Sequence, residues 1–152
     1  MLYGSTRSGI FNVAAPEAIL RGIAPDGGLY VPEKVPDLSG AIGDNFISVA
    51  RQIFAAMFPE FALKAGEIAR AAYGEHFSDL AVTPLKKVGN SYVLELFHGP
   101  TAAFKDVALC ALPLSMSAAK ELTGDKQDIL ILTATSGDTG SAALAGVKDV
   151  PG

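Results

Sequence analysis

Cysteine is scarce in this sequence: Cys110 is the only one among 152 residues. No disulfide can therefore form within the chain, which suits a reducing compartment such as the cytoplasm. Because Cys110 lies in the hydrophobic stretch 107–119, we expect it to be a small buried core residue. The alternative for this side chain is a catalytic nucleophile.

Long apolar runs and an excess of positive charge are also absent. No segment reaches the roughly 18 to 20 apolar residues of a membrane-spanning helix, and residues 1–9 lack the charged and apolar regions of a signal peptide. The net charge is −4, whereas a nucleic-acid or anionic-membrane partner needs a basic patch. We therefore expect a soluble cytoplasmic protein that binds neither nucleic acid nor membranes. We also expect no metal site.

Apolar residues are abundant, at 49% of the chain, and charged residues make up only 18%. This composition supports a folded core and not a disordered segment. The residue pattern changes near residue 80, from helical spacing before it to strand-like segments after it, and the length permits two small domains. We therefore divide the chain into residues 1–80 and residues 81–152.

Residues 1–80 predict a small α+β domain in which turns separate short helices and a strand. Proline and aspartate or asparagine mark helix starts, and glycine or a later proline marks helix ends. The expected elements are a helix from Pro16 to Gly22, a turn at 26–28, a strand at 29–31, a helix from Asp44 or Asn45 to Pro59, and a helix at 63–73 ending at Gly74. His76 is expected to be a polar surface or boundary residue.

Residues 81–152 predict the start of an α/β domain with a parallel sheet. The expected order is strand, helix, strand, turn and helix, which is typical of such sheets. Because another strand should follow the last helix, we expect a truncated sheet. The expected elements are strands at 83–88 and 91–96 joined by a type I′ turn at Gly89-Asn90, a buried helix at 104–122 kinked or divided by Pro113, a strand at 129–133 covered on both faces, and a turn at 135–140 leading into a helix.

Lys105 stands at the predicted start of a helix among apolar neighbours, Ala103, Phe104 and Val107. Loss of solvation there would lower the pKa of its amine, which Schiff-base and general-base lysines require. The alternative is an ordinary first-turn lysine that pairs with Asp106 or extends into water. These residues alone leave both interpretations open.

The turn at 135–140, Thr-Ser-Gly-Asp-Thr-Gly, lies between a predicted strand and a predicted helix. Backbone N–H groups at a helix start, helped by hydroxyls, can bind a carboxylate or a phosphate. The alternative is a simple polar cap. The glycine and lysine spacings of dinucleotide-binding and P-loop motifs are missing.

Asp138-Thr139-Gly140 also spells the D-T-G of aspartic proteases. That chemistry requires two aspartates that share a proton, and a second chain would have to supply the other one. It also requires an apolar strand leading directly to the aspartate, whereas Ser136 and Gly137 intervene. The predicted strand-to-helix setting disfavours this interpretation.

Three motifs follow one another along the chain: an opening motif made of YGSTRSG (3–9), PEAILRGIAPDGGLYVP (16–32) and VP (35–36), then ELFHGPTAAFKDVAL (95–109), then ATSGDTGSAA (134–143). Together they resemble the threonine synthase family, pyridoxal-phosphate enzymes of the tryptophan-synthase-β-like fold (fold type II). Asp138 is the threonine-synthase form of a position where related enzymes usually carry asparagine. Three long motifs in the right order make this resemblance specific, and it covers nearly the whole chain.

The resemblance implies roles for individual residues. Lys105 would bond covalently to pyridoxal 5′-phosphate and then move protons at the substrate carbons, with Phe104 beside the cofactor. The turn would bind the substrate carboxylate through Thr135, Ser136, Gly137, Asp138 and Thr139, with Asp138 also near the cofactor ring. For His98, Thr101 and Asp106 the resemblance leaves the roles open; the last two could fix the turn and cap the helix.

The implied reaction is the last step of threonine biosynthesis, conversion of O-phospho-L-homoserine and water to L-threonine and phosphate by γ-elimination and β-addition. The resemblance puts the loop that binds the cofactor phosphate beyond residue 152. We therefore expect this chain to be the N-terminal portion of such an enzyme and to lack full activity alone. The alternative is a non-catalytic fragment or degenerate paralogue that acts as a folding or interaction module and self-associates through uncovered apolar surface.

Overall fold

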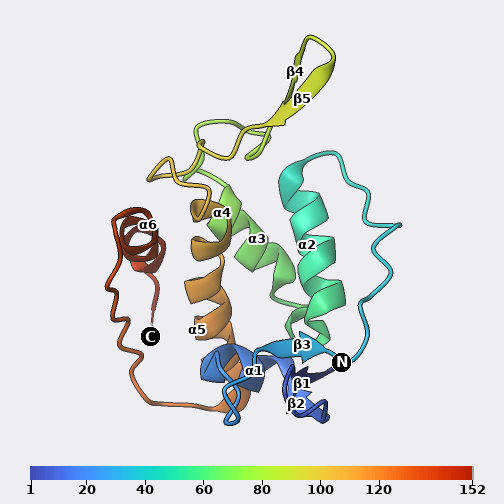
Figure 1. Ribbon diagram of the computed structural model, residues 1–152, viewed down its shortest axis with the longest axis vertical. Helices are drawn as coiled ribbons and strands as arrows, with labels where there is room; N and C mark the ends of the chain where they lie inside the picture. Colours follow the sequence, from blue (N-terminus) through green and yellow to red (C-terminus); the bar gives the residue numbers. More distant parts are fainter. Residues whose placement is uncertain (152) are drawn as a thin grey trace.

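The computed structural model describes residues 1–151. A small antiparallel sheet lies at one end of a group of helices, and a hairpin projects from the other end (Figure 1). The sheet contains β1 (Leu2–Ser5), β2 (Phe11–Ala14) and β3 (Tyr30–Pro32) in the order β2-β1-β3. The predicted strand at 29–31 is thus present, shifted by one residue. This part has the mixed α and β character that the sequence predicts.

Two motifs that are distant in the sequence meet at the edge of this sheet. Asp26 accepts hydrogen bonds from the Ser5 hydroxyl (2.6 Å) and the Gly28 N–H (2.9 Å) through the same Oδ1 atom. These two donors lower the pKa of the Asp26 carboxyl. A side chain at Gly28 would lie 2.0 Å from the Ser5 hydroxyl, so the close approach requires glycine. Asp26 therefore fastens the turn at 26–28 onto β1.

The predicted helices of the first 80 residues are all formed. Helix α1 (Ala15–Arg21) ends at Gly22, and α3 (Ala65–Tyr73) ends at Gly74. Helix α2 (Phe46–Met57) is followed by the short helix η1 (Pro59–Phe61). Of the two candidate caps, Asn45 and not Asp44 begins α2, because its Oδ1 accepts the Ser48 N–H at 2.9 Å.

The apolar core consists of two clusters that both combine the first 80 residues with later ones. One cluster surrounds Phe61, which is 2% exposed, and includes Tyr3 and Ala119. The other brings Tyr73 against Cys110 and Ala111. Helix α5 (Leu112–Thr123) packs on α1 and so completes the first cluster. The division at residue 80 stays a prediction.

The hairpin and the divided helix confirm two predictions from the second half of the chain. Strands β4 (Leu85–Val88) and β5 (Ser91–Leu94) pair antiparallel, and Pro113 lies in the first turn of α5, which follows the four-residue α4 (Asp106–Leu109). The turn type is wrong: Gly89 has φ +60° but Asn90 has no positive φ, whereas type I′ requires it at both positions. The expected all-round burial is also wrong, because Leu112 and Leu122 are exposed.

The predicted strand at 129–133 is not formed. These residues run as an extended segment, and no hydrogen bond joins their backbone groups to any other described residue. Leu130 and Leu132 are 89% and 90% exposed. The apolar sequence favours a strand, but a strand also needs a neighbour that supplies its hydrogen bonds. The predicted parallel sheet is therefore absent from residues 1–151, whose two sheets are antiparallel.

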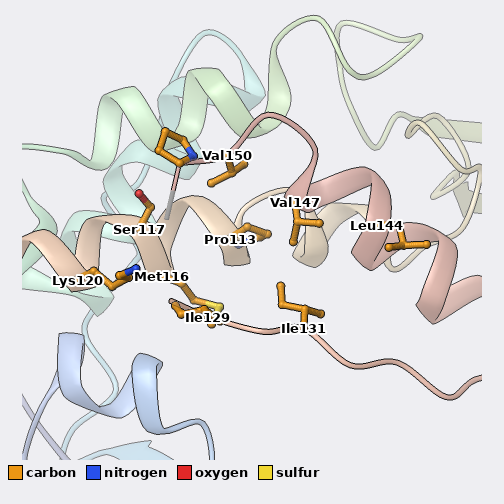
Figure 2. Close-up of a pocket in the computed structure, with 10 residues that line it drawn as sticks. Pro113, Met116, Ser117, Lys120, Ile129, Ile131, Leu144, Val147 and Val150 are labelled. Atoms are coloured by element: carbon orange, nitrogen blue, oxygen red, sulfur yellow. The ribbon is translucent and has the colours of Figure 1, made fainter. Parts of the chain in front are cut away.

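The extended segment partly covers a pocket of about 300 Å³ between α5 and α6 (Asp138–Val147). Figure 2 shows apolar side chains from both helices and from residues 129 and 131 pointing into this space. None of the predicted site residues lines it. Its lining consists of Pro113, Met116, Ser117, Lys120, Ile129, Ile131, Leu144, Val147, Val150 and Pro151.

Among residues 1–151, none of the helices has the length and apolar character that a membrane-spanning helix needs.

Candidate functional site

Lys105 immediately precedes helix α4 and is partly buried. Its Nζ lies 4.3 Å from the centroid of the Phe104 ring, in a cation–π contact. Within residues 1–151, Nζ forms no hydrogen bond and no ion pair. The pairing with Asp106 that the alternative interpretation expects is therefore not formed. The structure leaves this amine open to a reacting group.

Asp106, the next residue, is fully buried at 0% exposure. Its Oδ2 accepts the Thr101 N–H at 2.9 Å, and its Oδ1 accepts the Thr101 hydroxyl at 2.7 Å. A side chain at Gly99 would meet Asp106 atoms at 2.5 Å, so only glycine fits beside the carboxylate. Asp106 and Thr101 thus fix the turn before α4, one of the two roles considered from the sequence.

The same turn contains a backbone conformation that the sequence does not reveal. Ala102 has φ +57°, in the left-handed region that non-glycine residues rarely adopt. Ala102 is exposed, so packing of its methyl group does not explain this conformation. The hydrogen bonds of the neighbouring residues hold it there, because Thr101 bonds to Asp106 and the Ala102 N–H donates to the Gly99 carbonyl at 3.1 Å.

We predict that Ala102→Gly raises the free energy of unfolding by about 1 kcal/mol, because glycine adopts positive φ without the Cβ clash. Ala108 is another exposed alanine, within α4, and Ala108→Gly should instead lower stability by roughly 1 kcal/mol. Urea denaturation of both variants measures the difference. Destabilisation by both changes to a similar extent would contradict the strained turn.

His98 links three segments around this turn. Its Nε2 lies 2.8 Å from Glu95 Oε2, and its Nδ1 lies 3.3 Å from the Ser78 hydroxyl. The backbone carbonyl of His98 also accepts the Ser78 N–H at 2.8 Å. The histidine thereby ties the end of the hairpin and the loop at 78 to the turn that carries Lys105. The sequence left its role open, because one of its partners, Ser78, lies 20 residues away in the chain.

The second predicted site, residues 135–139, lies at the start of α6 and is largely exposed. The Thr135 hydroxyl accepts the N–H groups of Gly137 (3.1 Å) and Gly140 (3.0 Å), so this side chain shapes the turn. Gly137 has φ +144°. The backbone N–H groups of Asp138 and Thr139 have no hydrogen-bond partner among residues 1–151. These two donors suit a carboxylate.

The two predicted sites lie on helices that contact each other. Helix α6 packs on α4, and a side chain at Gly146 would lie 2.0 Å from the Leu109 carbonyl, so only glycine permits this approach. No hydrogen bond or ion pair joins Lys105 directly to residues 135–139 within the described chain. The structure therefore brings the two elements together through the contact between α4 and α6.

Two alternative chemistries receive no support from the structure. Cys110 is buried at 6% exposure, and this burial, with the Asp106 charge nearby, raises its thiol pKa to about 11. A buried neutral thiol is a poor nucleophile. Asp138 begins a helix instead of following an apolar strand, as a D-T-G protease aspartate would require.

Comparison with known proteins identifies the family. Residues 2–73 match the family model described as threonine synthase N terminus. The chain is 38% identical to threonine synthase from Schizosaccharomyces pombe over 96% of this chain and 31% of that protein. A crystal structure of PLP-bound threonine synthase from Brucella melitensis superposes with a TM-score of 0.87 at 36% identity, over 99% of this chain and 34% of that chain. The chain belongs to the threonine synthase family and matches the N-terminal portion of its members.

Some of the relatives in this family are named threonine synthase-like and not threonine synthase. The chain is also 41% identical to threonine synthase-like 1 from Macaca fascicularis, over 86% of this chain and 18% of that protein. The chain spans about a third of the length of the S. pombe and Brucella threonine synthases. Family membership is therefore clear, whereas the activity of the whole protein is a proposal.

Proposed function

We propose that this chain supplies the reactive lysine and the substrate-binding turn of a PLP-dependent threonine synthase. The observation that carries the proposal is the Lys105 amine: it lies on a turn fixed by buried Asp106 and forms no ion pair within residues 1–151. The similarity to threonine synthases extends over nearly the whole chain and supports the same assignment. We place the protein in the cytoplasm, in keeping with its single reduced cysteine.

The residues present fit pyridoxal phosphate. Lys105 offers a primary amine for the cofactor aldehyde, and the exposed ring of Phe104 next to it offers an apolar surface for the cofactor ring. When bound, the cofactor withdraws electrons from the substrate carbons. The Lys105 amine is the group of this chain that takes up and returns the protons of those carbons.

The free N–H groups of Asp138 and Thr139 would bind the carboxylate of the substrate, O-phospho-L-homoserine. Ser136 and Thr139 add hydroxyl donors, Gly137 allows the ligand to approach the backbone, and Thr135 keeps the turn in shape. The overall reaction takes one water and one O-phospho-L-homoserine, eliminates phosphate from the γ-carbon and adds the water at the β-carbon. The products are L-threonine and phosphate.

A hybrid enzyme tests this proposal. Residues 1–151 replace the matching N-terminal portion of the S. pombe threonine synthase, and the hybrid is incubated with pyridoxal phosphate and O-phospho-L-homoserine. We expect threonine and phosphate to form in equal amounts. A hybrid that folds and binds pyridoxal phosphate but releases no phosphate would contradict the proposal.

A second candidate function is a non-catalytic interaction module. The extended segment at 129–133 favours it, because Leu130 and Leu132 are almost fully exposed and its backbone groups are unpaired within the described chain. Such a segment is a template for pairing with another chain.

The isolated chain is therefore predicted to self-associate, and replacing both Leu130 and Leu132 with serine should shift it towards the monomer. Light scattering during size-exclusion chromatography measures the mass. Exchange of the exposed leucines Leu80 and Leu63 for serine is the control. A wild-type chain that elutes as a clean monomer at high concentration would exclude this surface as a contact.

A further inference from the structure

Asp106 is an unusual residue because a carboxylate is fully buried without a cation. Its side chain is 0% exposed, and no lysine, arginine or histidine pairs with it in residues 1–151. Burying such a group is costly unless hydrogen bonds satisfy it. Both oxygens are satisfied by one residue, Thr101, through its N–H (2.9 Å) and its hydroxyl (2.7 Å). This arrangement connects the start of α4 to the middle of the preceding turn.

The turn is constrained on both sides of that connection. Gly99 leaves no room for a side chain next to Asp106, and Ala102 is held at φ +57°. The Asp106 N–H donates to the Ala103 carbonyl at 3.0 Å, which closes the turn directly before α4. Residues 99–106 are therefore fixed by contacts among themselves, and the Asp106–Thr101 pair supplies the side-chain part of them.

Lys105 depends on this turn for its direction. Its carbonyl accepts the N–H of Leu109 at 2.8 Å, so its backbone is joined to the first turn of α4. Its Nζ lies 4.3 Å from the centre of the Phe104 ring, and this amine is not anchored by a hydrogen bond in the described part of the chain. The backbone of residues 101–106 thus sets where the amine points.

The same pair also keeps the carboxylate of the adjacent residue away from the Lys105 amine. Asp106 adjoins Lys105 in the sequence, and a free carboxylate there could form an ion pair with the amine. Because Thr101 engages both oxygens, this pairing does not occur. We infer that Asp106 and Thr101 are positioning residues for Lys105: they aim its amine and leave it unpaired for a carbonyl group. The functional meaning of this inference rests on the proposed function, but the geometry does not.

The test uses the position of the Lys105 amine above the Phe104 ring as a spectroscopic signature. Lysines of the intact chain are methylated with ¹³C-formaldehyde and a mild reductant, and their methyl resonances are recorded by NMR. The ring current should displace the Lys105 signal upfield of the exposed Lys126 and Lys148 signals. Lys105→Arg assigns the signal, and Phe104→Leu should abolish the displacement.

We expect Thr101→Val, which removes the hydroxyl, and Asp106→Asn each to remove at least half of this displacement, whereas Thr101→Ser should retain it. A residue that only stabilises the fold would lower the unfolding temperature without moving this resonance in the folded protein. If Asp106→Asn does not fold, the two Thr101 variants decide, because Thr101 is only partly buried. An unchanged displacement in Thr101→Val would overturn the inference. No pyridoxal phosphate is present, so this result is independent of the proposed function.

Discussion

Replacing Lys105 with alanine is expected to lower phosphate release by the hybrid enzyme about a thousandfold, because the amine is the proposed acid and base for the substrate carbons. The loss should appear in kcat, since the turn at 135–139 would still bind the substrate carboxylate. Binding of O-phospho-L-homoserine, measured separately by calorimetry, should change by less than about tenfold.

Lys126→Ala is the matched control, because Lys126 is exposed and lies outside both predicted sites. This variant should release phosphate at the rate of the unmodified hybrid. Full activity of Lys105→Ala would remove Lys105 from the chemistry, and equal losses in both lysine variants would indicate a general effect on the fold.

Replacing Phe61 with alanine should lower the free energy of unfolding by about 4 kcal/mol, through lost burial and the cavity left behind. Phe61 is 2% exposed and packs edge-on against Phe58, with ring centroids 6.0 Å apart. It also joins Tyr3 of the sheet to Ala119 of α5 in one cluster. Its loss therefore weakens the contact between the first 80 residues and the helix that follows the Lys105 turn.

Leu63 provides the control for this prediction, since it follows Phe61 by two residues and is fully exposed. Leu63→Ala should change stability by less than about 0.5 kcal/mol. Denaturant unfolding monitored by circular dichroism measures both variants. If Phe61→Ala cost no more than Leu63→Ala, the shared core around Phe61 would be refuted.

Local signals predicted most of the secondary structure. Asn45 as a helix cap, Gly22 and Gly74 as helix ends, and Pro113 as a helix divider each act within about one turn of the chain, so the sequence contains what determines them. The hairpin was equally local, apart from its turn type. In the turn only Gly89 takes a positive φ, as a type II′ turn requires.

Features that depend on distant partners could not be predicted in the same way. The apolar run at 129–133 has the composition of a buried strand, but no strand lies beside it in residues 1–151. The bond between Ser5 and Asp26 joins segments 21 residues apart, and the Ser78 hydroxyl lies 3.3 Å from the imidazole of His98, 20 residues later in the chain. In each case the decisive interaction lies outside the local pattern.

The identity of the reactive residue can be tested most directly by covalent capture. The hybrid is equilibrated with pyridoxal phosphate, reduced with borohydride and digested, and its peptides are analysed by mass spectrometry. We predict one phosphopyridoxyl group per chain, located on Lys105. A hybrid that retains pyridoxal phosphate but carries the label on another lysine, or carries none, would contradict the account.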